Sequence, residues 1–217
     1  MAKRPTFYVV AGPNGSGKSS IISNTELALL DIPYLCADGV ARSLVGDYPD
    51  RKARDEAAWG KCNTIREEFI EAGNSFIWET VCSHESRVEI MARAKDLGFE
   101  VSLIFVTTRS VEINVERVRQ RVLEGGHPVS EDLIRSRYPR TMALLPRLLR
   151  VSDRVRAYDN SVFGERPDPV LMLLDSRLTL FADPPLWAEE LFSKMEEESR
   201  AGISPHYEFI RDGKKEL

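Results

Sequence analysis

Residues 12–19 read GPNGSGKS and match the pattern GxxxxGK[ST] in full. A short apolar run from Thr6 to Ala11 precedes them with the composition of a buried strand, and the residues from Lys18 onward have the character of a helix. A strand, a glycine-rich loop and a helix in this order are the context in which the pattern binds phosphate groups. The segment therefore predicts an α/β domain built around this loop, with the loop at the carboxyl end of the first strand.

Each residue type in the loop has a physical task. Glycines permit backbone conformations that turn successive N–H groups inward, the ammonium group of Lys18 supplies positive charge to the outer phosphates, and the hydroxyl of Ser19 is an oxygen ligand for Mg²⁺. The motif thus predicts binding of a nucleoside triphosphate, ATP, together with Mg²⁺. The residues predicted to contact them are Gly12, Pro13, Asn14, Gly15, Ser16, Gly17, Lys18, Ser19 and Ser20.

Signatures of several other nucleotide-binding classes are absent from the sequence. GTPases carry DxxG and NKxD and transporter ATPases carry an LSGGQ-like motif, and none of these occurs. The run VLMLLD at residues 170–175 imitates a strand that ends in a metal-binding aspartate, but SRLTLF follows it directly in the manner of a hairpin. We therefore expect Asp175 to be a turn residue.

Strand-like and helix-like segments alternate along the chain. We expect strands at residues 6–11, 33–37, 75–79, 100–106 and 153–158, a hairpin from 170–174 and 178–181, and helices at 18–30, 49–72, 83–97, 110–123, 130–150 and 187–200. Pro139 and Pro146 should bend or break the helix at 130–150. The alternation predicts a doubly wound, mostly parallel sheet of the P-loop type, in a single α/β domain over residues 1–200 with a polar tail at 201–217.

Composition limits the classes of partner. The 30 Lys and Arg residues against 34 Asp and Glu residues give a net charge of −4, which argues against a general nucleic-acid binder. The longest apolar runs are far shorter than the ~20 residues that span a bilayer, so we expect no membrane association. Three widely spaced cysteines, Cys36, Cys62 and Cys82, predict reduced thiols and a cytoplasmic location.

Arginine is concentrated in one stretch of the chain. Eleven arginines but only six acidic residues lie between Arg109 and Arg156. This excess of guanidinium groups indicates a polyanionic ligand and predicts an arginine-rich helical lid over about residues 109–150. The first helix of this lid should end at Gly125 and should bury one face, formed by Val111, Val115, Val118 and Val122.

Longer motifs carry a resemblance to a known family. They are GPNGSGKSS at the loop, the segment around Asp38, FIWETVCS at residues 76–83, and the ordered run of EGGH, RYPR and YDNS between residues 124 and 161. With them the chain resembles the zeta-toxin-like family of P-loop kinases over most of residues 7–161. The resemblance implies transfer of a phosphoryl group from ATP to a hydroxyl group. Zeta toxins phosphorylate UDP-N-acetylglucosamine and are restrained by a small helical antitoxin, so a sugar-nucleotide acceptor and such a partner are implied too.

The resemblance also assigns roles to residues near the loop. Asp38 matches the catalytic base, which would accept the proton of the acceptor hydroxyl, although a carboxylate here could instead cap the following helix. Glu79 and Thr80 match the acceptor-binding positions, at the carboxyl end of a strand where open α/β sheets bind ligands. We expect Ser83 to cap the next helix rather than to bind the acceptor.

Three arginines and two polar residues complete the candidates. Arg117 matches a phosphate-clamping arginine of the family, Arg121 lies one helical turn further on the same face, and Arg137 comes from the next helix. Asn160 is a candidate contact for the adenine, with an Asx turn as an equal alternative. His127 is expected to be a turn or polar contact residue.

The sequence therefore predicts an ATP- and Mg²⁺-dependent kinase that acts on a hydroxyl group of a small molecule. The expected catalytic residues are Lys18, Asp38, Arg117, Arg121 and Arg137. A nucleotide-gated regulatory or binding ATPase is the main alternative. A polynucleotide kinase is a third interpretation, weakened by the scarcity of aromatic residues for base stacking, since Tyr138 is the only one among residues 109–150.

Overall fold

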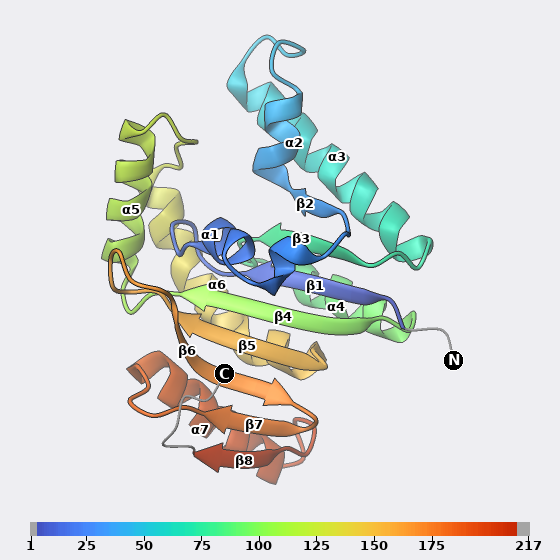
Figure 1. Cartoon of the computed structure of the whole chain (residues 1–217), viewed down its shortest axis with the longest axis vertical. Coiled ribbons are helices and arrows are strands. Elements are labelled where there is room, and N and C mark those ends of the chain that lie inside the picture. Colours follow the sequence, from blue (N-terminus) through green and yellow to red (C-terminus); the bar gives the residue numbers. More distant parts are fainter. Residues whose placement is uncertain (1–3, 212–217) are drawn as a thin grey trace.

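The computed structural model describes residues 4–211, and within them the backbone forms an eight-stranded sheet (Figure 1). In spatial order the strands are β2 (Tyr34–Cys36), β3 (Phe76–Thr80), β1 (Thr6–Ala11), β4 (Glu100–Thr107), β5 (Arg154–Asp159), β6 (Asp168–Leu174), β7 (Arg177–Leu180) and β8 (Glu208–Arg211). The strands from β2 to β5 are parallel, β6 is antiparallel to β5 and to β7, and β8 is parallel to β7. The predicted α/β fold with a mostly parallel sheet is confirmed.

Helices cover both faces of this sheet (Figure 1). They are α1 (Lys18–Ser23), α2 (Ala37–Ser43), α3 (Arg51–Glu71), α4 (Ser86–Asp96), α5 (Val111–Leu123), α6 (Glu131–Val151) and α7 (Leu186–Arg200). Alternate residues of β1 face opposite sides, so Phe7 and Val9 pack in the large core with α4, α6 and α7, whereas Val10 packs with Ile21 and Ile22 of α1. Because β1 is buried on both faces, the loop that follows it lies centrally at the carboxyl edge of the sheet.

Two helical parts flank this edge. Helices α2 and α3 lie beyond β2 and extend away from the sheet, while α5 stands at the carboxyl ends of the central strands (Figure 1). A small apolar cluster of Ala41, Leu44 and Ala58 holds α2 on α3. The carboxyl ends of β1 and β3 therefore lie between the two parts, which is where the predicted site residues gather.

The helix predicted at residues 18–30 is shorter in the structure. Helix α1 ends at Ser23, whose hydroxyl donates to backbone carbonyls of the preceding turn, and Thr25 has an extended backbone. A short 3₁₀ helix, Glu26–Leu29, follows and buries Leu27 beside α1. The predicted helix is therefore divided into a shorter α-helix and a 3₁₀ helix.

Helix α6 does not break at its two prolines and is more deeply buried than predicted. It continues from Glu131 to Val151 without a break, although Pro139 and Pro146 lie inside it. Proline removes one helical hydrogen bond, and burial of the apolar face offsets this loss. Buried residues of its second half are Thr141, Leu144, Leu145, Pro146, Leu148 and Leu149. The second half of α6 is therefore part of the core, and the predicted lid at 109–150 is too long.

The segment 201–217, which we expected to be a polar tail, contributes to the sheet. Strand β8 pairs with β7 inside it, and residues 212–217 lie outside the described range. The Tyr207 side chain is buried, and the ring of Phe209 packs edge-on against Phe192 of α7. Burial of these aromatic rings stabilises a strand whose sequence shows little β-pattern.

Two predictions about the class of protein can be compared with the structure. Within residues 4–211 the three cysteines are free, and Cys62 and Cys82 are buried. None of the helices in the same residues is long and apolar enough to cross a lipid bilayer.

Candidate active site

The loop after β1 has the backbone that its glycine pattern requires. Gly12 and Gly17 have φ values of +149° and +96°, a region that disfavours side chains. A Cβ atom on Gly12 would overlap the carbonyl oxygen of Val106, and one on Gly17 would overlap the side-chain Nδ2 atom of Asn160. The loop is therefore folded tightly against β4 and against the segment that follows β5.

The Lys18 side chain lies inside this loop. Its Nζ atom donates to the Pro13 carbonyl oxygen at 2.9 Å, and the residue is only 7% exposed. Burial lowers the pKa of Lys18 from its usual 10.5, an effect that the carboxylates of Glu79 and Asp38 oppose and the Arg121 guanidinium reinforces. Glu79, Asp38 and Arg121 are thus close enough to act electrostatically on Lys18, although they come from three other elements.

A carboxylate faces the Ser19 hydroxyl. Ser19 Oγ donates to Glu79, with distances of 3.0 and 3.3 Å to the two carboxylate oxygens, and the Tyr34 hydroxyl donates to the same carboxylate. Burial and the charge of Glu79 raise the pKa of Tyr34, so the phenol keeps its proton and remains a donor. These contacts place Glu79, which the resemblance assigns to the acceptor, beside the predicted metal ligand Ser19.

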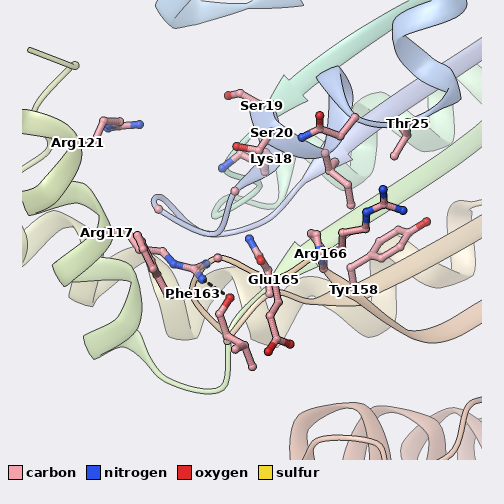
Figure 2. Close-up of a pocket in the computed structure, with 18 of the residues that line it drawn as sticks. Lys18, Ser19, Ser20, Thr25, Arg117, Arg121, Tyr158, Phe163, Glu165 and Arg166 are labelled. Atoms are coloured by element: carbon pink, nitrogen blue, oxygen red, sulfur yellow. Dashed lines mark hydrogen bonds between the residues drawn. The ribbon is translucent and has the colours of Figure 1, made fainter. Parts of the chain in front are cut away.

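The loop forms one wall of a cavity of about 740 Å³ (Figure 2). Lys18 and Ser19 line it together with Arg117 and Arg121 of α5. Figure 2 shows the two arginines on the opposite side of the cavity from Tyr158, which belongs to β5. The structure therefore brings five of the nine predicted loop residues, Gly15, Gly17, Lys18, Ser19 and Ser20, and two of the three predicted arginines to one cavity.

The two arginines on α5 keep N–H groups without partners. Arg117 Nη2 donates to the Val162 carbonyl oxygen at 3.3 Å, and Arg121 Nη2 donates to the His127 carbonyl oxygen at 2.6 Å. Arg117 Nη1 and Arg121 Nε are buried and have no hydrogen-bond partner among residues 4–211. Burial lowers the pKa of Arg117, although the charge of Asp159 opposes this. Guanidinium groups that lie beside a cavity and do not use all their N–H donors within the protein are suited to an oxyanion ligand.

Sequence reasoning missed one wall of the cavity. Residues 162–167, which follow β5, line it together with Tyr158, Asn24 and Thr25. Phe163 in this segment is 81% exposed. An exposed aromatic ring needs an explanation when it borders a polar cavity, because it offers a face on which a planar ligand can stack. The available signal was an aromatic residue in a stretch rich in glycine, proline and charge.

Asp38 lies in the first turn of α2 and is exposed. It does not cap this helix, because the N-cap is Cys36, whose sulfur accepts from the Gly39 N–H at 3.2 Å. The capping alternative is therefore wrong. Asp38 is outside the residues that line the cavity, but its charge acts on Lys18. The carboxylate is thus near the loop and available for another partner.

Thr80 is the last residue of β3, and Ser83 follows it three residues later. The Thr80 hydroxyl accepts from the Cys82 N–H at 3.4 Å, and Cys82 has a positive φ of 59°, so the chain turns sharply here. Thr80 does not line the cavity. The N-cap of α4 is Glu85, so the prediction that Ser83 caps this helix is wrong.

Asn160 and Arg137 both support the loop. Asn160 Nδ2 donates to the Ser16 carbonyl oxygen at 2.8 Å, and Arg137 Nη1 is 3.4 Å from the Asn14 side-chain oxygen. The Asx turn is made by the neighbouring Asp159, which accepts from the Ser161 N–H at 3.1 Å. Both predicted residues therefore contact the loop, Asn160 from the position directly after β5 and Arg137 from α6.

Two residues with weaker assignments also have clear positions. His127 Nε2 lies 2.9 Å from Arg51 Nη2 at the start of α3, so His127 is a polar contact residue as predicted. Asp175 and Ser176 have positive φ values of 49° and 62° and connect β6 to β7. Asp175 is thus a turn residue, as predicted, and lies in a hairpin far along the sheet from the loop.

Comparison with known proteins places the chain in a family. A family model for an AAA domain matches residues 8–137, which include the whole glycine-rich loop and Lys18. The chain belongs to this family. The chain is also 32% identical over 138 residues to an uncharacterized protein of Haemophilus influenzae, with 64% of this chain and 94% of that protein aligned.

Solved structures share the fold of this AAA domain. The complex of AvrRxo1-ORF1 and AvrRxo1-ORF2 with sulphate ions has a TM-score of 0.66 at 14% identity, over 89% of this chain. The chain spans 64% of the length of that solved chain. The PezAT chromosomal toxin–antitoxin system of Streptococcus pneumoniae has a TM-score of 0.54 at 18% identity, over 73% of this chain and 69% of the other. The Pnkp1/Rnl/Hen1 RNA repair complex also has a TM-score of 0.54, at 12% identity, over 99% of this chain and 81% of the solved chain.

Proposed function

We propose that this AAA domain is an ATP- and Mg²⁺-dependent kinase that phosphorylates a hydroxyl group of a small molecule. The observation that carries the proposal is the positive charge around one cavity, which Lys18 lines on one side and Arg117 and Arg121 of α5 line on another. Phosphoryl transfer depends mainly on positioning and on neutralising the phosphate oxygens. Planar, permanently charged guanidinium groups opposite a lysine provide both.

ATP is the proposed phosphate donor. The glycine-rich loop is suited to its phosphates, and Tyr158 and Phe163 offer aromatic surface for its base on the same cavity. A solved form of the AvrRxo1-ORF1 complex contains ATP, which supports the same ligand here. Asn160 was predicted to contact the adenine. Its hydrogen bond to the Ser16 carbonyl instead favours a role in holding the loop in place.

The residues around Ser19 fit Mg²⁺. Ser19 Oγ and the Glu79 carboxylate are 3.0 Å apart and are hard oxygen donors of the kind that Mg²⁺ prefers. Mg²⁺ is commonly held by one or two such groups together with the phosphates of a substrate. Bound there, it would neutralise charge on the phosphate oxygens. Tyr34, which donates to Glu79, would fix the orientation of that carboxylate.

Asp38 is the proposed general base. Its carboxylate neither caps α2 nor lines the donor cavity, yet it lies near Lys18. In the proposed reaction the acceptor oxygen bonds to the γ-phosphorus as the bridging oxygen of ADP leaves, and Asp38 takes the hydroxyl proton. Thr80, at the carboxyl end of β3, is proposed to contact the acceptor.

A zeta-toxin-like kinase is the finer form of the proposal. The motifs EGGH, RYPR and YDNS support it, as does the fold shared with the PezAT system. UDP-N-acetylglucosamine is therefore the first acceptor to test, and a small helical antitoxin is the proposed partner. Free thiols and the use of ATP fit the cytoplasm as the proposed location.

An acceptor screen tests this proposal against its alternatives. Purified protein is incubated with ATP and Mg²⁺, and ADP release is measured with and without each compound of a panel. The panel contains UDP-N-acetylglucosamine, unphosphorylated sugars, nucleosides, and an oligonucleotide with a free 5′ hydroxyl, included because the shared fold extends to an RNA repair complex. A small-molecule kinase gives acceptor-dependent ADP, a polynucleotide kinase responds to the oligonucleotide, and a regulatory ATPase releases ADP at one rate throughout.

A further inference from the structure

Asn114 is a polar residue buried inside α5, the helix that carries Arg117 and Arg121. It is 0% exposed, and α5 buries only Asn114 and Val118, whereas Val122 of the predicted valine face is exposed. A buried amide destabilises a fold unless it is hydrogen-bonded. The partners of Asn114 therefore show what it contributes.

Those partners are the glycine-rich loop and the segment after β4. Asn114 Nδ2 donates to the Asn14 carbonyl oxygen at 2.6 Å. Asn114 Oδ1 accepts from the hydroxyl of Thr108, which is also fully buried. The carbonyl of Asn14 can only accept, so these two contacts fix which way the amide of Asn114 is turned.

The bond to Asn14 constrains the next peptide in the loop. A peptide unit is planar and trans, so the carbonyl of Asn14 and the N–H of Gly15 point in opposite directions. When Asn114 holds this carbonyl toward α5, the Gly15 N–H is turned away from α5, and Gly15 lines the cavity. Inward N–H groups are what such a loop uses to bind phosphate, whereas a carbonyl oxygen in that place would repel it.

The same residue also fixes the position of α5 along the loop. The backbone carbonyl of Asn114 approaches Gly15 so closely that a Cβ atom on Gly15 would overlap it. Arg117 and Arg121 follow three and seven residues later on α5, on the same side of the helix as Asn114. A change in the contact between Asn114 and the loop would therefore move both arginines relative to the phosphates.

We propose that Asn114 is a positioning residue for the nucleotide. It orients the peptide between Asn14 and Gly15 for phosphate binding, and it fixes the position of the α5 arginines relative to the loop. The inference rests on the proposed function for the presence of a triphosphate at this loop.

Two variants remove the donor. Asn114→Leu keeps the volume of the side chain, and Asn114→Asp keeps its shape and its acceptor for Thr108. Each should raise the Kd for ATP with Mg²⁺ about tenfold or more, since a hydrogen bond that orders a charged site is lost. The backbone amide of Gly15, followed by ¹⁵N NMR, should move strongly downfield on ATP binding in the unmodified protein and much less in both variants.

Thr108→Val is the matched control. It removes, at constant shape, the hydroxyl that contacts both Asn114 Oδ1 and, at 2.8 Å, the Ser110 carbonyl oxygen, and it should lower Tm at least as much as the Asn114 variants, but it leaves the bond to Asn14 intact. We expect its ATP affinity within threefold of the unmodified protein, with the full Gly15 shift. Equal losses of affinity in Thr108→Val and Asn114→Leu would reduce Asn114 to a structural role, and so would a Gly15 shift that all variants retain.

The design separates this inference from the proposed function. If the unmodified protein binds ATP and no acceptor is phosphorylated, the kinase proposal fails and the Asn114 result still decides the inference. If both Asn114 variants bind ATP within threefold of the unmodified protein, only the inference is overturned. If the unmodified protein does not bind ATP with Mg²⁺, both are overturned.

Discussion

At the scale of single residues, Lys18 connects stability with function. Its ammonium group is buried in the loop, where one backbone carbonyl accepts from it, and the charges of Glu79 and Asp38 only partly compensate for burial. A buried cation is unfavourable for folding but useful for binding phosphate. The free protein therefore holds this charge at some expense of stability, and a ligand with several negative charges relieves it.

Replacing Lys18 with methionine should separate the two effects. Because the pKa of Lys18 is lowered by folding, the charged side chain destabilises the free protein at pH 7; this penalty is full below the lowered pKa and is lost as pH rises to the usual 10.5. We expect Lys18→Met to have an equal or higher Tm without ligand, yet to lose turnover by about 10³-fold or more. Thermal unfolding and an ADP assay measure both. A variant that melts earlier, or keeps over about a tenth of the turnover, would contradict this assignment.

At the scale of elements, the arginine-rich segment divides into an exposed part, which we propose to be a lid, and a core part. The carboxyl half of α5 and the turn after it are largely exposed, and their arginines bond backbone carbonyls of neighbouring loops. The second half of α6 is anchored in the core, where Thr141 Oγ1 also donates to the Val81 carbonyl oxygen at 3.1 Å. Only the first part is free to respond to a ligand.

Hydrogen exchange should show this division. Residues 117–130 should exchange fast in the free protein and become protected with ATP and Mg²⁺, because the ligand supplies the missing partners of Arg117 and Arg121. Residues 141–151 should be protected in both states. Equal protection of residues 117–130 with and without nucleotide would show that no lid forms there.

The parts of the site that follow one another in the chain could be predicted from sequence. The loop motif, the strand before it and the arginines of α5 are local patterns whose physical meaning does not depend on distant residues. Asn114 gave no such signal, since a polar residue among valines in a helix is usually solvated. The extent of the lid was misjudged for the same reason, because a run of arginines does not show which turns of α6 are buried.

At the scale of the whole molecule, the candidate site and strand β8 lie at well-separated positions along the sheet. The loop follows β1, and four strands, β4 to β7, lie between β1 and β8. The sequence showed the alternation that produces the parallel part of the sheet. It did not show β8, because this strand forms through pairing with β7 and packing of Tyr207 and Phe209, contacts between distant segments.

Two aromatic substitutions should have separate effects, one on stability alone and the other on ATP affinity alone. Tyr207→Ala removes a buried ring and should lower the free energy of unfolding by about 3 kcal/mol without changing ATP affinity. Phe163→Ala removes an exposed ring beside the cavity and should weaken ATP binding by about tenfold without changing stability. Urea denaturation and ATP titration are measured for both. Loss of ATP affinity in folded Tyr207→Ala, or unchanged affinity in Phe163→Ala, would contradict this separation.

The destination of the γ-phosphate tests the kinase proposal most directly. With [γ-³²P]ATP, Mg²⁺ and the best acceptor of the screen, the unmodified protein should transfer the label to the acceptor. Asp38→Asn should bind ATP within a few-fold and melt at nearly the same temperature, because Asp38 is exposed and Cys36 caps α2, but should lose about 10²-fold in transfer. Label released only as inorganic phosphate with every acceptor, or equal transfer by Asp38→Asn, would contradict the proposed mechanism.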